Sequence, residues 1–310
     1  MLSSLQGMII LDEIQLKPEL FNVLRVLMDS PENKSKFLVL SSASPHIIKN
    51  VSETLAGRVE FIELSGFNML EAKDRDNLWL RGGFPRSFLA ASETDSLAWR
   101  EGFIRTFLER DIPMLGITIA AAAMRRFWTM LAHSHGQTWN ASELGRSMGL
   151  TDKTIRSYLD ILTSTFMIRQ LQPWHENIRK RQVKAPKIYF RDTGLLHSLL
   201  NIPDYHNLMG NPRMGASWEG FALEQVLQVT RPTEAYFWST YGGAEIDLFF
   251  FQNGKRYGVE FKFSEAPKVT KSMHIAIQDL SLDHLWVVHP GEHEYPVTDK
   301  ITARPLTALL

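Results

Sequence analysis

The sequence contains no cysteine among its 310 residues. That absence excludes disulfide bonds, thiolate nucleophiles and cysteine-ligated zinc. No apolar run approaches the roughly 18 residues of a membrane-spanning helix, and the N-terminus lacks a basic-then-apolar signal pattern. Lys plus Arg and Asp plus Glu balance at 34 each. The overall charge therefore does not indicate a nucleic-acid partner, so any basic surface must be local. Together these features predict a cytoplasmic protein with no membrane partner.

A second absence concerns nucleotide chemistry. The segment MIILDEIQ, residues 8–15, places four apolar residues before Asp12 and Glu13, the pattern of a buried strand that carries two carboxylates at its C-terminal end. In ATP-hydrolysing P-loop proteins such carboxylates face Mg²⁺ and the attacking water. The GxxxxGK[ST] motif that wraps the phosphates occurs nowhere in the sequence, and only seven residues precede the strand. We therefore expect that this chain does not hydrolyse ATP by itself.

The rest of the N-terminal third predicts a helix and two more strands. Hydrophobic spacing indicates a helix over residues 18–28, a buried strand over residues 36–45 and a third strand over residues 58–65. Ser42 ends the second strand, where a γ-phosphate sensor would sit beside the Asp-Glu strand. The alternative is that Ser42 only ends the strand and begins a turn.

Residues 139–162 predict a helix-turn-helix. Asn140 is the expected N-cap of the first helix, Gly149 ends that helix, and Thr151 caps the second. The start of the second helix presents polar side chains outward, as a groove-reading element requires. The basic residues among them are Lys153 and Arg156.

Two strands, FMIRQLQPW and APKIYFRD, then flank a basic connection, HENIRKRQVK, at residues 175–184. This order predicts a winged helix whose wing contacts DNA phosphates. The basic residues in or beside the wing are Arg179, Lys180, Arg181, Lys184 and Lys187. A wing that only packs domains together or binds protein is the open alternative.

The C-terminal third contains AEIDLFFFQNGKRYGVEFKF, residues 244–263. Asn253-Gly254 between two apolar runs predicts a type I′ β-hairpin. Counting outward from that turn places Asp247 opposite Glu260. The predicted polar face holds Glu245, Asp247, Glu260 and Lys262, and the apolar face holds Ile246, Leu248, Val259 and Phe261.

The opposed carboxylates of Asp247 and Glu260 need an explanation, because like charges across a ladder destabilise it. A divalent cation such as Mg²⁺ is one explanation, since this ion favours carboxylate ligands. The other is a solvated strand face on which Lys262 relieves the repulsion. The hairpin alone leaves both open.

Several strings, in order along the chain, resemble one family. After the Asp-Glu strand come LAGRVEFIELSGFNMLEA, GGFPRSFLAAS, FLERDI, KAPKIYFRDTGLLHSLL and GASWEGFALEQV. They resemble the AAA-like bacterial and archaeal ATPases with a C-terminal domain of unknown function, over nearly the whole chain. The resemblance implies ATP as the family's nucleotide, and the missing P-loop is where this sequence departs from it. In the family's sheet the P-loop strand is expected between the sensor strand and the strand after it. Without it, either those two strands pair with each other, or a strand edge stays open to a second copy or another partner chain.

The C-terminal hairpin, with Asp followed by Glu-x-Lys, resembles the PD-(D/E)xK nuclease core. That resemblance implies that Asp247 and Glu260 hold a metal ion. It implies that Lys262 orients or activates water and stabilises the developing phosphorane charge. Glu219, on the preceding helix, matches the fold's additional acid and would complete the ion shell. Alternatively, Glu219 is an acid that favours a helix N-terminus.

The sequence thus predicts an α/β protein in three parts. Residues 1–118 form an incomplete P-loop-type parallel sheet with a helical lid, residues 119–200 a winged helix, and residues 201–310 a PD-(D/E)xK nuclease-like α/β domain. The favoured function is that of a DNA-associated protein of the AAA-like ATPase family. The alternatives are a Mg²⁺-dependent nuclease and a non-catalytic regulatory or protein-binding module.

Overall fold

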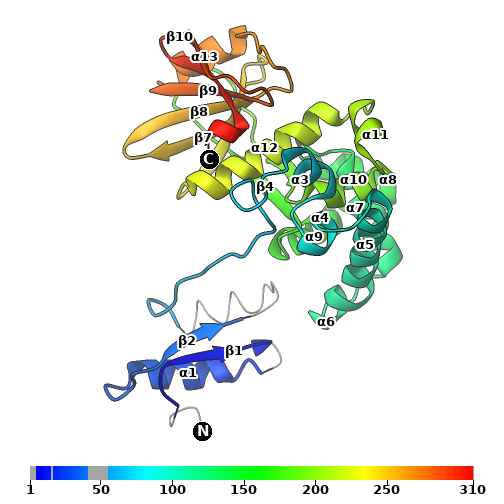
Figure 1. The fold of residues 1–310 in the computed structure, drawn as a ribbon, viewed down its shortest axis with the longest axis vertical. Coiled ribbons are helices and arrows are strands. Elements are labelled where there is room, and N and C mark those ends of the chain that lie inside the picture. The colour runs from blue at the N-terminus through cyan, green and yellow to red at the C-terminus, as the bar shows by residue number, and fades with distance from the viewer. Residues whose placement is uncertain (1–4, 15–16, 41–54, 310) are drawn as a thin grey trace. The chain divides into compact units, whose positions relative to one another are not determined.

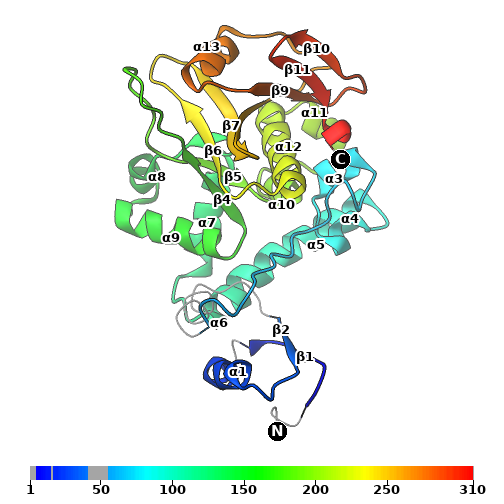
Figure 2. The same cartoon turned by 90° about the vertical axis from the view of Figure 1, so that its left-hand side faces the viewer.

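The computed structural model describes residues 5–14, 17–40 and 55–309 (Figures 1 and 2). The chain folds as two compact units. One comprises Met1–Leu64 and Asp160–Met167, and the other comprises Ser65–Leu159 and Ile168–Leu310. Within the described ranges no helix has both the length and the apolar character needed to span a bilayer.

The first unit is built on a small parallel sheet. β1 (Met8–Leu11) pairs with β2 (Lys36–Val39), and α1 (Leu20–Asp29) packs its apolar face against them. The two strands and the helix confirm the expected order of elements. The prediction that the first strand is buried is wrong for one of its faces, because Met8 is 68% and Ile10 58% exposed.

The prediction of a third strand in this unit is also wrong. Residues 58–65 lie wholly in the described part of the chain and form no strand. Their apolar side chains are exposed, with Leu64 at 96%. Among the described residues β1 and β2 pair only with each other. Apolar composition is not enough for a third strand, because a strand forms only where its backbone groups find a partner strand.

Helices dominate the chain from residue 75 to residue 132. They are α3 (Arg75–Arg81), α4 (Pro85–Phe88), α5 (Glu93–Thr106), the π-helix η3 (Phe107–Asp111), α6 (Ile112–Met114) and α7 (Ala121–Ala132).

Two of the family-like strings, GGFPR and RDTGLL, pack against each other. The carboxylate of Asp192 accepts hydrogen bonds from the backbone N–H groups of Gly83 and Leu195. A Cβ at Gly194 would lie 2.0 Å from the carbonyl oxygen of Arg81. Glycine is therefore required there for close backbone approach, which gives these strings a structural role.

The predicted helix-turn-helix elements form where the sequence indicates. They are β3 (Gln137–Thr138), α8 (Ala141–Met148), α9 (Asp152–Ser164), β4 (Ile168–Pro173) and β5 (Lys187–Phe190). The Asn140 side chain accepts a hydrogen bond from the N–H of Glu143, and Gly149 adopts the left-handed conformation that ends α8. Thr151 accepts a hydrogen bond from the N–H of Thr154, so the three predicted cap positions are confirmed.

A nine-stranded mixed sheet organises the second unit, in the order β10-β11-β9-β8-β7-β6-β4-β5-β3. Its remaining strands are β6 (Ala235–Ser239), β7 (Glu245–Gln252), β8 (Lys255–Phe261), β9 (His284–His289), β10 (Tyr295–Thr298) and β11 (Ile301–Pro305). β4 pairs in parallel with β6, so one sheet runs from the helix-turn-helix segment into the C-terminal segment. The mixed α/β class is as expected, while the division at residues 118 and 200 remains a prediction.

Helices cover both faces of this sheet. The helices of this part are α10 (Thr193–Leu199), α11 (Tyr205–Met209), α12 (Met214–Thr230), α13 (Lys271–Asp279) and the short 3₁₀ helix η4 (Leu306–Leu309). α12 packs on one face of β7 and β8 through one apolar cluster, and α13 packs on the opposite face through another. Figure 1 shows the two helices on either side of these strands.

Candidate carboxylate site

The hairpin that carries the predicted motif has the expected register. Gln252 pairs with Lys255, and the ladder continues to Leu248 opposite Val259. Asn253 and Gly254 have φ angles of 52° and 75°, as a type I′ turn requires. Beyond the last ladder pair, the backbone N–H of Phe261 donates to Asp247 Oδ2 at 3.0 Å. The polar residues therefore lie where the two strands leave regular pairing.

The predicted alternation of faces is wrong at one point. Ile246 packs with Trp238 and Phe249 in the cluster under α13, whereas Leu248 packs in the cluster under α12. The pairing of β6 with β7 shifts register between Tyr236 and Trp238. A β-bulge there breaks the two-residue period, so Ile246 and Leu248 do not share a face.

Lys187 supplies a cation that the motif did not include. Its ammonium lies 2.5 Å from Glu245 Oε1 and 3.3 Å from both Glu219 Oε1 and Asp247 Oδ1. The Lys187 side chain is only 5% exposed, and its ammonium lies 5.6 Å from the centre of the Phe237 ring. The prediction that Lys187 contacts phosphate beside a wing is wrong, because this side chain is buried among carboxylates.

Tyr189 on β5 and Glu219 on α12 form one side of the site. Tyr189 lies two residues after Lys187 on β5, so both side chains leave the same face of that strand. Its hydroxyl donates to Glu219 Oε1 at 2.5 Å. Burial raises the pKa of Glu219, and the neighbouring Asp247 raises it further while Lys187 opposes the change. Burial alone lowers the pKa of Lys187, but the surrounding acidic groups outweigh it and hold this pKa well above its usual value.

Glu260 and Lys262 form the other side. Lys262 Nζ lies 2.7 Å from Glu260 Oε1. Glu260 Oε2 is buried and has no hydrogen-bond partner in the structure. Burial, and then the charge of Asp247, raise the pKa of the Glu260 carboxyl, whereas Lys262 lowers it. Glu260 is thus a carboxylate with one satisfied and one unsatisfied oxygen.

The structure therefore brings the four residues implied by the nuclease resemblance into one electrostatic cluster. The side chains of Asp247 and Glu260 are 8% and 9% exposed. No group of three or more His, Cys, Asp and Glu side chains in the described ranges has the arrangement of a metal site. The carboxylate chemistry suits Mg²⁺ or Mn²⁺, but the Lys187 ammonium now lies among three of the acidic groups.

Sequence reasoning missed Lys187 and Tyr189 as members of this site. The available signal was the segment KIYF, in which a lysine and a tyrosine alternate with Ile188 and Phe190 in a strand that is buried throughout. A lysine in such a strand needs an acidic partner.

The predicted DNA-contacting residues lie on two segments. Lys153 and Arg156 are exposed on α9, three positions apart and hence on neighbouring positions of one helix surface. The exposed basic residues of the connection after β4 are Arg179, Lys180, Arg181 and Lys184.

The basic connection packs on the C-terminal part of the sheet. Lys180 Nζ lies 2.6 Å from Asp279 Oδ2, and the Arg181 guanidinium lies 4.4 Å from the centre of the Tyr241 ring. Val183 donates its backbone N–H to Ser239. These contacts fix the connection beside β6, and its role toward DNA stays a prediction.

The predicted nucleotide residues belong to the first unit. Asp12 and Glu13 directly follow β1, both exposed, and the backbone N–H of Glu13 donates to Asp12 Oδ1 at 2.9 Å. Glu13 has a φ of 52°, a sparsely populated conformation for a residue other than glycine. Ser42 lies outside the described residues. The assignment of these three residues to ATP remains a prediction.

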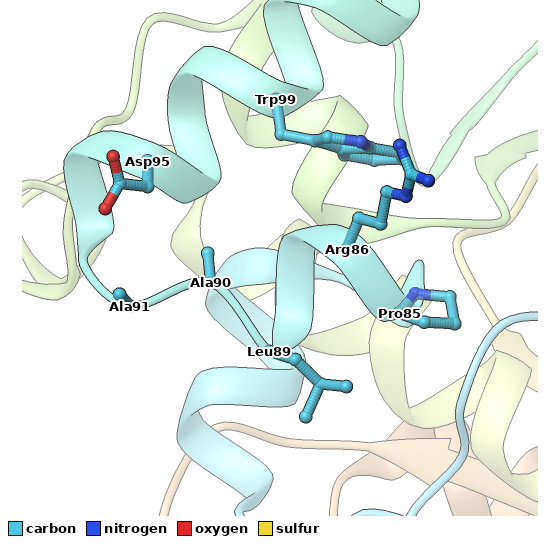
Figure 3. Close-up of a pocket in the computed structure, with 7 residues that line it drawn as sticks. All are labelled: Pro85, Arg86, Leu89, Ala90, Ala91, Asp95 and Trp99. Atoms are coloured by element: carbon cyan, nitrogen blue, oxygen red, sulfur yellow. The ribbon is translucent and has the colours of Figure 1, made fainter.

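An open pocket of about 560 Å³ lies elsewhere, on α4 and α5. Figure 3 shows Arg86 beside Trp99, with Asp95 at the opposite side of the lining. The pocket is lined by Pro85, Arg86, Leu89, Ala90, Ala91, Asp95 and Trp99. It shares no residue with the carboxylate cluster and brings together only two charged groups.

Three family comparisons cover most of the chain. Residues 2–73 match an AAA domain, residues 72–206 match a domain of unknown function (DUF8612), and residues 214–309 match another domain of unknown function (DUF4143). Two relatives are the uncharacterized protein Rv2008c of Mycobacterium tuberculosis and the uncharacterized protein Mb2031c of Mycobacterium bovis. Each is 51% identical over 311 residues, an alignment that covers all of this chain and 70% of the relative. No solved structure matches the chain.

Proposed function

The chain belongs to the family of these two mycobacterial proteins and matches an AAA domain over residues 2–73, and on that premise we propose that it is a DNA-associated protein with a divalent-cation-dependent nuclease site. The observation that carries the proposal is that Glu219 Oε1 and Asp247 Oδ1 both lie 3.3 Å from the Lys187 ammonium, while Glu260 is buried on the strand that pairs with β7. The unpartnered, buried Glu260 Oε2 supports it, since a buried carboxylate oxygen without a donor is costly.

Charge balance favours a divalent cation. With every group ionised, the carboxylates of Glu219, Glu245, Asp247 and Glu260 carry four negative charges, and Lys187 and Lys262 carry two positive charges. The cluster then has an excess of two negative charges, and its members Asp247 and Glu260 are buried, where uncompensated charge is unfavourable. Burial, and then the charge of Asp247, raise the pKa values of Glu219 and Glu260. One divalent ion would neutralise the excess.

Each side chain has a role suited to phosphodiester hydrolysis. Asp247 and Glu260 would hold the ion, and Glu219 would complete its surroundings from α12. The ion, when bound, supplies Lewis-acid polarisation of the phosphate. Lys262 is 40% exposed and can reach a substrate phosphate, where its ammonium would orient water and stabilise the negative charge that develops on the phosphorus oxygens.

DNA association rests on the exposed basic side chains. Lys153 and Arg156 lie near the start of α9, as the base-contacting residues of a winged helix do. Arg179 and Lys184 flank the packed part of the basic connection and are exposed. A positive patch of this kind binds phosphates regardless of the neutral total charge.

The test is a cleavage assay with DNA and Mg²⁺ or Mn²⁺ on the whole chain and on Asp247→Asn. Asparagine keeps an oxygen for the N–H of Phe261, so this hydrogen bond is retained while a metal ligand loses its charge. We expect metal-dependent cleavage that Asp247→Asn abolishes and that Asp299→Asn, at an exposed turn, leaves intact. DNA binding without cleavage by the wild type or either variant would rule out the nuclease activity and leave DNA association. Neither binding nor cleavage would leave a non-catalytic module.

A further inference from the structure

Lys187 lies in the centre of the carboxylate cluster. It reaches that place from β5, a strand that pairs with β3 and β4 in the helix-turn-helix part of the sheet. The carboxylates around it come from other elements, Glu219 from α12 and Glu245 and Asp247 from β7. One side chain therefore ties the helix-turn-helix segment to the proposed nuclease site.

The ammonium is held as a bound ion would be. Three carboxylates contact it, it is almost fully buried, and the Phe237 ring closes one side. Mg²⁺ and Mn²⁺ bind carboxylate oxygens at about 2.1 Å. An ion placed at that distance from Asp247 Oδ1 would lie a few ångströms from the Lys187 ammonium, in a poorly solvated place where like charges repel strongly. The ion and the ammonium in its present position would therefore repel each other.

We propose that Lys187 is the resident counter-ion of this cluster, which a divalent cation must displace before the site is loaded. This inference rests on the proposed function for the identity of the incoming ion. The long flexible stem of lysine allows the ammonium to withdraw without unfolding the strand.

The first experiment titrates Mn²⁺ alone into the whole chain by calorimetry. Lys187→Met removes the ammonium while keeping a long, unbranched apolar side chain, and Lys255→Met removes an exposed lysine at the hairpin turn as the matched control. We expect Lys187→Met to bind Mn²⁺ at least about ten-fold more tightly than wild type, because it no longer has to displace a cation. Lys255→Met should bind as wild type does.

The same variant makes a second prediction about thermal stability. Without metal, Lys187→Met leaves three carboxylates without their cation, so its melting temperature should fall below that of wild type, and Mn²⁺ should restore it. Equal or weaker Mn²⁺ binding by Lys187→Met would overturn the proposal. A melting temperature that Mn²⁺ does not raise would overturn it too.

A measurement on wild type covers the case in which the variant does not fold. Lysine acylation followed by mass spectrometry should label exposed Lys255 at all times and Lys187 hardly at all without metal. Saturating Mn²⁺ should raise the labelling of Lys187 several-fold as its ammonium leaves the cluster. Continued protection of Lys187 at saturating Mn²⁺ would overturn the displacement.

Mn²⁺ binding and DNA cleavage together separate the counter-ion role of Lys187 from the nuclease activity. If Lys187→Met binds Mn²⁺ more tightly than wild type but DNA is not cleaved, the counter-ion role of Lys187 is supported and the nuclease activity is ruled out. If cleavage depends on Asp247 but wild type and Lys187→Met bind Mn²⁺ equally, the nuclease activity is supported and the counter-ion role is ruled out. No Mn²⁺ binding by either protein overturns both.

Discussion

His197 predicts a specific loss of stability in acid. It is fully buried on α10, with Nδ1 2.9 Å from the Leu80 carbonyl oxygen and Nε2 2.7 Å from Ser217 Oγ. Burial lowers the pKa of His197 from 6.5 to about 4, although the hydrogen bond to Leu80 opposes the change. The folded protein therefore keeps this imidazole neutral under conditions in which the unfolded chain would protonate it.

The sign and size of the effect follow from proton linkage. The unfolded chain takes up its proton near its ordinary pKa of about 6.5, so acidification below that value favours unfolding. The loss continues until the folded pKa of about 4 is reached. A shift of this size corresponds to about 3 kcal/mol of unfolding free energy, of which about 2 kcal/mol is lost by about pH 5.

Urea unfolding followed by tryptophan fluorescence measures the unfolding free energy between about pH 7 and about pH 5. We expect His197→Gln to be less stable than wild type near neutral pH, by about 1–3 kcal/mol for the disrupted hydrogen bonds. Over the acid range it should lose about 2 kcal/mol less than wild type. His206→Gln, at an exposed histidine, should keep the wild-type slope. Identical pH slopes for wild type and His197→Gln would show that His197 does not cause the loss of stability in acid.

Three further predictions concern the helix-turn-helix, the basic connection and the hairpin. A Cβ at Gly145 would lie 2.8 Å from the Leu150 carbonyl oxygen. Gly145→Ala should therefore lower the unfolding free energy by about 1–3 kcal/mol, and a more stable variant, as the higher helix propensity of alanine alone would give, would contradict this. Neutralising Arg179 or Lys184 should each reduce the slope of log DNA affinity against log salt by about 1, and unchanged slopes would argue against phosphate contact. Asn253→Ala should cost about 1 kcal/mol in urea unfolding because the position has a positive φ, whereas Asn253→Gly should cost less.

Local signals predicted the elements well where chain neighbours decide the structure. Asn140, Gly149 and Thr151 cap their helices as expected, because each cap is a contact between residues close in sequence. Asn253-Gly254 fixed the register of β7 and β8 for the same reason, since a two-residue turn leaves one pairing.

The failures occurred where distant parts of the chain decide. The apolar run of residues 58–65 has the composition of a strand, but composition does not supply a neighbouring strand. The bulge that separates Ile246 from Leu248 is set by pairing with β6, about ten residues away across a loop, and the alternation rule cannot detect it.

The candidate site shows the same division. Asp247, Glu260 and Lys262 lie on one hairpin, so their proximity follows from one turn. Glu219 was reached only through a family resemblance, because no local rule brings α12 to β7. Lys187 comes from a strand about 60 residues before the hairpin. In the sequence it follows the basic residues of the connection, so it was assigned to DNA contact with them. Only the fold shows that this lysine is buried with carboxylates.

Calorimetric titration of Mn²⁺ into wild type, Lys187→Met and Asp247→Asn measures whether this carboxylate cluster is a cation site with a resident ammonium. We expect the tightest binding for Lys187→Met, intermediate binding for wild type, and strongly weakened or lost binding for Asp247→Asn. Binding by Asp247→Asn that equals that of wild type, or no binding by any of the three proteins, would contradict it.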